Sequence, residues 1–71
     1  MRLPIISGQQ AIKVFVKQGY LVQRQRGSHV MLVKEGTGRL TVPLHTELDR
    51  GTLRALIRAA GMTVEDFVRW L

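Results

Sequence analysis

Residues 20–43 read YLVQRQRGSHVMLVKEGTGRLTVP, and this stretch decides the fold. Glycines divide it into three segments that are rich in β-branched and apolar residues. The last segment ends at Pro43, because proline has no N–H to donate to a strand ladder. The four apolar residues 30–33 predict a middle strand that is central in the sheet or covered on both faces. Since the connections are short, we expect an antiparallel meander of three strands, over Tyr20–Arg26, Ser28–Lys34 and Arg39–Val42.

A helix is predicted on the N-terminal side of these strands. Ser7 and Gln10 have the spacing of a capping box, in which each side chain bonds the backbone N–H of the other residue. Gly19 is suited to end the helix in a left-handed conformation. The apolar face is expected to contain residues 12, 15 and 16.

Two helices are predicted after the strands and a loop over residues 44–50. The first runs from near Thr52 to Ala60 and stops at Gly61. Thr63 caps the second, whose buried face is expected to contain Val64, Phe67, Val68 and Leu71. The order α-β-β-β-α-α predicts an α+β fold, a three-stranded antiparallel sheet with helices on one face. The 71 residues have room for one domain, residues 1–71.

Positive charge is concentrated in the first half of the chain. The net charge is +6, and six lysines and arginines precede the first acid, Glu35. From Glu35 onward the chain has five arginines and five acids, so the excess belongs to the N-terminal half. Such a surface either binds a polyanion or is a solvated basic face.

Several function classes are disfavoured by what the sequence lacks. It has no cysteine, so it has neither disulfides nor a cysteine zinc site, which fits a reducing cytoplasm. No stretch is long enough to span a bilayer. Without metal-ligand spacing or a glycine-rich phosphate loop, a metalloenzyme or a nucleotide-dependent enzyme is not expected. We therefore expect no metal and no cofactor.

The residues that could support chemistry lie in Arg24-Gln25-Arg26-Gly27-Ser28-His29. Arginine forks fit phosphates, glycine lets a backbone approach a ligand, and histidine exchanges protons near neutral pH. RNA cleavage needs little more, because the 2′-hydroxyl is a built-in nucleophile. On residues alone, however, one histidine on a strand is more often structural, and His45, in a loop, is a weaker candidate.

Three motifs in order resemble the HicA toxin family. They are Gly27-Ser28-His29, then Val42-Pro43-Leu44-His45, then LDRGTLRALIRAAG over residues 48–61. The resemblance covers nearly the whole chain. One departure is the helix start at residues 7–10, where family members often carry a basic residue and this chain has none.

The resemblance implies a fold like the double-stranded RNA-binding domain, here with a short extra C-terminal helix. It also implies a cytoplasmic mRNA interferase, neutralised by a HicB-like antitoxin and without a membrane partner. His29 is then the catalytic general acid or base, and His45 has no firm role. The expected RNA-binding residues are Lys13, Lys17, Arg24, Arg26, Gly27 and Ser28.

Two other interpretations stay open. A non-catalytic RNA-binding module of the same fold would use His29 only to form hydrogen bonds. A protein-interaction domain would dock an acidic partner on the basic surface, and an antitoxin would satisfy this interpretation together with the toxin.

Overall fold

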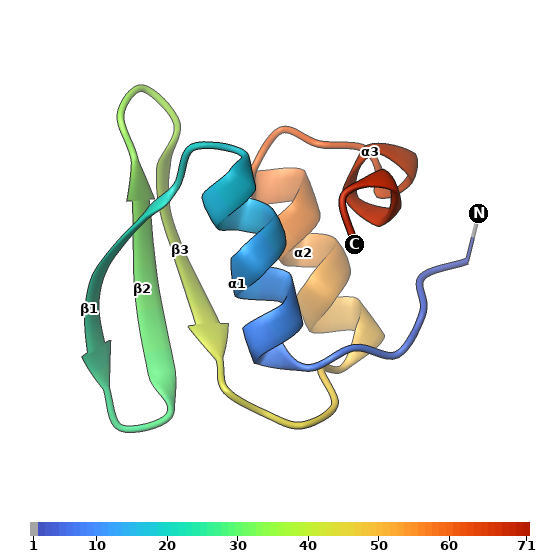
Figure 1. Cartoon of the computed structure of the whole chain (residues 1–71), viewed down its shortest axis with the longest axis horizontal. Helices are drawn as coiled ribbons and strands as arrows, with labels where there is room; N and C mark the ends of the chain where they lie inside the picture. The colour runs from blue at the N-terminus through green and yellow to red at the C-terminus, as the bar shows by residue number, and fades with distance from the viewer. Residues whose placement is uncertain (1) are drawn as a thin grey trace.

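The computed structural model describes residues 2–71 and confirms the predicted α+β order (Figure 1). The three strands form an antiparallel meander in the order β1-β2-β3, so β2 is central. Helices α1 and α2 lie on one side of this sheet, and α3 packs against α2. The elements are α1 (Gly8–Lys17), β1 (Leu21–Arg26), β2 (His29–Lys34), β3 (Gly38–Pro43), α2 (Arg50–Ala59) and α3 (Val64–Arg69).

One hydrophobic core fills the space between the sheet and the helices. Its centre is aromatic, with the ring of Phe15 5.4 Å from Phe67 and 5.9 Å from Tyr20 between centroids. The segment before α1 also packs on the core, because the Leu3 side chain is buried. The carbonyl of Leu3 accepts a hydrogen bond from the Nε of Arg50, at the start of α2, at 3.0 Å. Among residues 2–71 fifteen apolar residues are buried, which is the small core expected for so short a chain.

Local signals in the sequence explain where the helices begin. Ser7 and Gln10 form the predicted capping box on α1, and Thr63 with Asp66 forms another on α3. Each box satisfies two backbone N–H groups that a helix start leaves without partners. Gly19, which follows α1, has the predicted left-handed backbone at φ +104°.

The structure corrects three details of the sequence prediction. On α1 Phe15 is buried as predicted, but Val16 is 45% exposed, Ile12 is half-buried, and Ala11 and Val14 complete the buried face. Helix α2 begins at residue 50, because Asp49 caps it by accepting from the N–H of Thr52 at 3.1 Å.

The third correction concerns the last helix, whereas the prediction for the middle strand is confirmed. Strand β2 is central in the sheet and is covered on one face only, since Met31 and Val33 are half-buried. On α3 only Phe67 is buried, and Leu71 is 45% exposed. Over residues 2–71 no helix is both long and apolar enough to cross a bilayer.

Candidate active site

The two faces of the sheet differ because side chains alternate along each strand. On β2 and β3 the residues that face the helices are buried: Val30, Leu32, Leu40 and Val42. The alternate residues point to the other side, which no element of residues 2–71 covers. Cross-strand partners share a face, so the registers assign nine residues to what we call the open face: Leu21, Arg24, Arg26, His29, Met31, Val33, Arg39, Thr41 and Pro43.

The open face is basic. Arg24, Arg26 and Arg39 are exposed on it, and none of its nine residues is acidic. The Nε of Arg24 contacts the Sδ of Met31 at 3.4 Å, which confirms that these two side chains lie on the same face. A cationic surface without acids suits a phosphate chain.

His29 is the first residue of β2 and lies beside Arg26 on one strand and Pro43 on the other. It is exposed, so a ligand on the open face has access to its ring. The turn before it is defined by Gly27, whose φ of +58° is unfavourable for other residues. Gln25 secures the turn by donating to the carbonyl of Gly27 at 3.0 Å.

Three segments meet at the end of the sheet that carries His29. The N–H of Leu44 donates to the carbonyl of Ser28 at 2.6 Å, and the N–H of Gly8 donates to the carbonyl of His45 at 2.9 Å. A Cβ on Gly8 would overlap the carbonyl oxygen of Pro43, so only glycine permits this approach. These contacts join the start of α1 and the loop after β3 to the turn that carries the candidate histidine.

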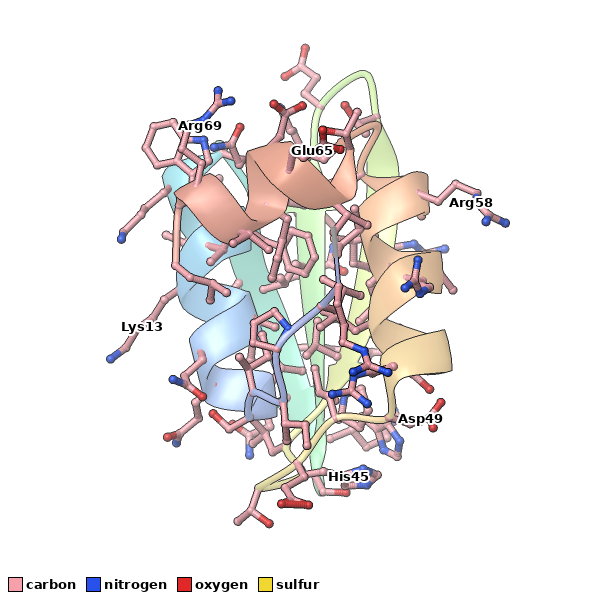
Figure 2. The ribbon with its side chains drawn as sticks, turned by 90° about the vertical axis from the view of Figure 1, so that its right-hand side faces the viewer. Lys13, His45, Asp49, Arg58, Glu65 and Arg69 are labelled. Carbon is pink, nitrogen blue, oxygen red and sulfur yellow. The ribbon has the colours of Figure 1, made fainter. Side chains whose placement is uncertain are left out.

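His45 shares this end of the molecule. Its side chain is exposed in the loop after β3, and Figure 2 shows it at the end opposite to α3. It lies two residues beyond Pro43, the cross-strand partner of His29. A second histidine thus lies at this end of the molecule, although sequence reasoning assigned it no firm role.

The other two residues predicted to bind RNA lie elsewhere. Lys13 and Lys17 are exposed on α1, in the helix layer, and Figure 2 shows Lys13 pointing away from it. Lys13 lines a groove of about 410 Å³ between α1 and β1. The Nζ of Lys17 donates to the carbonyl of Trp70 at 3.4 Å. The predicted residues therefore separate into Arg24, Arg26, Gly27, Ser28 and His29 on one hairpin and the two lysines on another surface.

Sequence reasoning missed two sets of arginines. Arg39 joins the open face through its register with Val33, and the alternation along β3 was the signal for it. The other set lies along one side of α2, four residues apart, and consists of Arg50, Arg54 and Arg58. The acids do not neutralise that set by contact: among residues 2–71 the one ion pair within 4 Å joins Arg69 to Asp66 at 3.8 Å.

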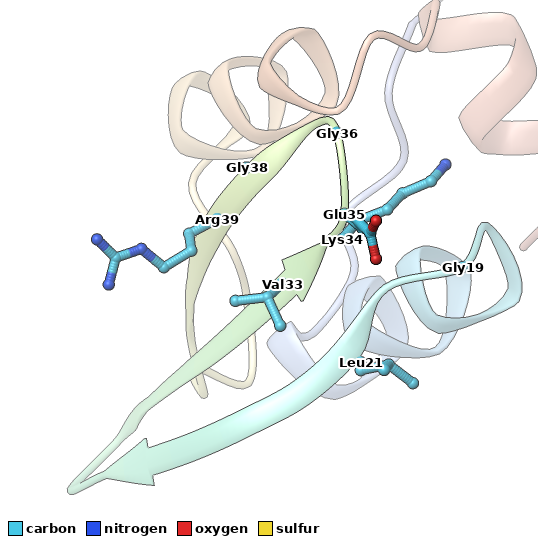
Figure 3. A pocket seen from close by; sticks show the side chains of 8 residues that line it. All are labelled: Gly19, Leu21, Val33, Lys34, Glu35, Gly36, Gly38 and Arg39. Carbon is cyan, nitrogen blue, oxygen red and sulfur yellow. The ribbon is translucent and has the colours of Figure 1, made fainter.

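A hollow of about 620 Å³ lies at the opposite end of the sheet from His29. It is formed at the turn between β2 and β3, and Figure 3 shows Lys34 and Arg39 pointing away from one another there. Its lining includes the acid Glu35. Within the described chain no three His, Cys, Asp or Glu side chains form a metal-binding group.

Comparison with known proteins agrees with this arrangement. A family model described as "HicA toxin of bacterial toxin-antitoxin" matches residues 8–62, from the first residue of α1 to the end of the turn after α2. The chain belongs to the HicA toxin family. The match includes the β1–β2 hairpin and the loop that carries His45, so the predicted resemblance is confirmed.

A solved structure supports the fold of this HicA-family chain. It is described as "Toxin-Antitoxin complex from Streptococcus pneumoniae" and contains a chain that is 29% identical, with a TM-score of 0.72. The alignment covers 80% of this chain and 98% of that chain. A search of curated proteins finds no match.

Proposed function

We propose that this HicA-family chain is an endoribonuclease that cleaves mRNA on its open face, with His29 as general acid or base. The observation that carries the proposal is the position of His29, exposed beside Arg26 on a face with three arginines and no acid. A structural histidine would be buried and hydrogen-bonded within the fold. The His29 side chain instead has no hydrogen-bond partner among the described residues.

The chemistry follows from groups that RNA and this chain already contain. The 2′-oxygen forms a bond to phosphorus, and the bond from phosphorus to the 5′-oxygen breaks. One proton leaves the 2′-hydroxyl for a base and another reaches the departing 5′-oxygen from an acid, so the products are a 2′,3′-cyclic phosphate and a 5′-hydroxyl. His29 performs one of these transfers. Arg24 and Arg26 stabilise the additional negative charge on the phosphorane oxygens.

RNA binding on this face should depend mainly on phosphates. The open-face arginines offer charged forks without a competing carboxylate, and the turn at Gly27 and Ser28 presents backbone at close range. The face has no Phe, Tyr or Trp on which bases could stack. We therefore expect weak discrimination between sequences and strong sensitivity to salt.

A HicB-like antitoxin is the proposed protein partner. The solved structure that this chain resembles is described as a toxin–antitoxin complex. Covering His29 and the flanking arginines would block substrate and chemistry together, and it requires acidic or hydrogen-bonding side chains on the partner. A complex that leaves His29 open to solvent and RNA would contradict this mode of inhibition.

A non-catalytic RNA-binding module is the second candidate. It is favoured by the absence of acids from the open face, which leaves His29 without a neighbouring carboxylate for the second proton transfer. The two candidates make the same prediction for binding but differ in the RNA products.

Induced expression separates the two candidates. The toxin should stop growth and protein synthesis and leave mRNA fragments with cyclic phosphate ends. Co-expression of a HicB-like antitoxin should restore growth. A chain that binds RNA in cells but leaves the mRNA intact would contradict the nuclease and support the binding module.

A further inference from the structure

Strand β1 is the most exposed element of the fold. All six of its residues are exposed, whereas β2 and β3 each bury two. Its contacts with other elements are concentrated on β2, and Figure 1 shows it at the edge of the sheet beyond the helices. Its outer edge has no strand partner among residues 2–71, so a row of backbone N–H and C=O groups is available there.

Two neighbouring side chains on β1 indicate what kind of partner fits. Leu21 is 69% exposed and Val22 is 55% exposed, and consecutive residues of a strand point to opposite faces. Val22 lies on the helix side, where it lines the groove with Ile12, and Leu21 lies on the open face. A partner on one face would cover only one of them. A strand added to the edge would give both a cross-strand neighbour.

The charge of β1 restricts which strand can be added. Arg24 and Arg26 are exposed on it, it has no acid, and Lys13 lies at the groove beside it. A second copy of β1 would place arginines close to arginines, which is destabilising across a strand pair. A bulge between Val22 and Arg24 is a further feature that discourages indiscriminate edge pairing.

We propose that β1 is a docking edge that pairs with a β-strand of the antitoxin, a strand with acidic side chains opposite Arg24 and Arg26. This inference rests on the proposed function in that the antitoxin is the partner. Main-chain hydrogen bonds would supply affinity, while the acids and the contacts with Leu21 and Val22 would supply specificity. Because Arg26 is the cross-strand partner of His29, the added strand would bring the antitoxin beside Arg26, one strand away from the candidate histidine.

Hydrogen exchange of the parent chain tests the pairing directly. The probe is a HicB-like antitoxin, and the measurement compares the amides of residues 21–26 in the free chain and in the complex. We expect exchange in this segment to slow by about tenfold or more on binding, because edge amides gain partners. Exchange at the free-chain rate in a complex that protects the turn at residues 27–29 would overturn the proposal.

Matched variants test the same edge through affinity. Leu21→Thr combined with Val22→Thr keeps the shape of a strand but removes the apolar contacts, and it should weaken antitoxin binding by about 10- to 100-fold. The control is Val16→Thr on α1, which changes an apolar residue that is also about half exposed. Equal affinity for the double variant and the control would contradict a docking role for β1.

Other occupants give different results. If the β1 amides of the free chain become better protected as its concentration rises, the edge pairs with a second copy, and the proposal is overturned. Protection of β1 by RNA but not by the antitoxin would overturn it too. The nuclease proposal can be contradicted independently. If the chain cuts no RNA but the antitoxin protects β1, the docking proposal stands and the nuclease proposal is wrong.

Discussion

β1 and β3 are the two outer strands of the same sheet, but their surroundings differ. Strand β3 contacts both α1 and α2, and it buries Leu40 and Val42 beneath them. Strand β1 buries nothing and has two arginines on the open face. Strand β2, between them, contributes to both the core and the open face, because Val30 and Leu32 are buried and His29 is exposed.

This difference indicates a division of roles across the sheet. Side chains between the sheet and the helices hold the fold together, because they remove apolar area from water. Side chains on the β1–β2 hairpin contribute little burial and are therefore free to bind a ligand. Substitutions on the helix side should reduce stability first, and substitutions on the hairpin should reduce RNA binding and cleavage with the fold intact.

The largest loss of stability is expected for Phe67→Ala. The ring of Phe67 is fully buried against Phe15, and its removal leaves a cavity that should cost about 3–5 kcal/mol. A domain of this size has a free energy of unfolding of roughly 4–11 kcal/mol, so the variant should be barely folded. Urea unfolding followed by circular dichroism measures the change. Trp70→Ala, at an exposed position on the same helix end, is the control and should lose much less.

Gly8→Ala should reduce stability by about 1–3 kcal/mol, the usual range for a side chain forced into a packed position. Alanine normally favours a helix over glycine, so the loss has to come from the overlap of the new Cβ with the carbonyl of Pro43. Gln9→Ala, one residue further along the same helix and exposed, should be close to neutral. A gain in stability for Gly8→Ala would mean that α1 does not approach the end of β3 as described.

Arg24→Gln combined with Arg26→Gln tests the hairpin side. In a His29→Ala background, which prevents cleavage, binding of single-stranded RNA should weaken and its logarithmic salt slope should decrease by about 1–1.5, since each phosphate contact contributes about 0.7. The unfolding free energy should stay within about 0.5 kcal/mol of the parent, as for other surface substitutions. Arg69→Gln on α3 is the matched control. If RNA binding by the His29→Ala chain with both arginines intact does not depend on salt, the interaction is not based on phosphates.

Tyr20→Phe should have the smallest effect. The hydroxyl of Tyr20 is buried and has no hydrogen-bond partner among the described residues, so its removal should be neutral or stabilise by up to about 1 kcal/mol.

Burial raises the pKa of Tyr20 above its usual value of 10.0, because the phenolate is poorly solvated there. The stability linked to this group is therefore fully present below pH 10 and is lost as the pH rises through the raised pKa. The free energy of unfolding, measured from pH 8 to 12, should fall less with rising pH for Tyr20→Phe than for the parent chain, because the chain has no other tyrosine. An identical fall in both chains would contradict the assignment.

Much of the fold could be predicted because its signals are local. Ser7 with Gln10, Gly19, Gly27 and Thr63 each specify a cap or a turn through their immediate neighbours. The start of α2 was missed because Asp49 can serve either a loop or a cap, and the contacts of the folded helix decide between them. The exposure of Val16 was also missed, since it depends on how α1 is rotated against the sheet.

The candidate site could be predicted only where it is contiguous. Arg24, Arg26 and His29 lie within six residues, and one hairpin brings them together. Arg39 joins them through the pairing of β2 with β3, and Lys13 is separated from them by its position on α1. The positions of Arg39 and Lys13 depend on the tertiary arrangement, which cannot be read from the distribution of charge along the sequence.

The cleavage rate of His29→Ala tests the central claim most directly. Single-turnover cleavage of a labelled RNA is measured with a chelator present for the parent, His29→Ala and His45→Ala, beside the urea unfolding of each chain. We expect His29→Ala to lose about 10²- to 10⁴-fold in rate with unchanged stability, His45→Ala to lose less, and the parent to leave 2′,3′-cyclic phosphate ends. Cleavage by His29→Ala at the parental rate, or inhibition of the parent by the chelator, would contradict the account.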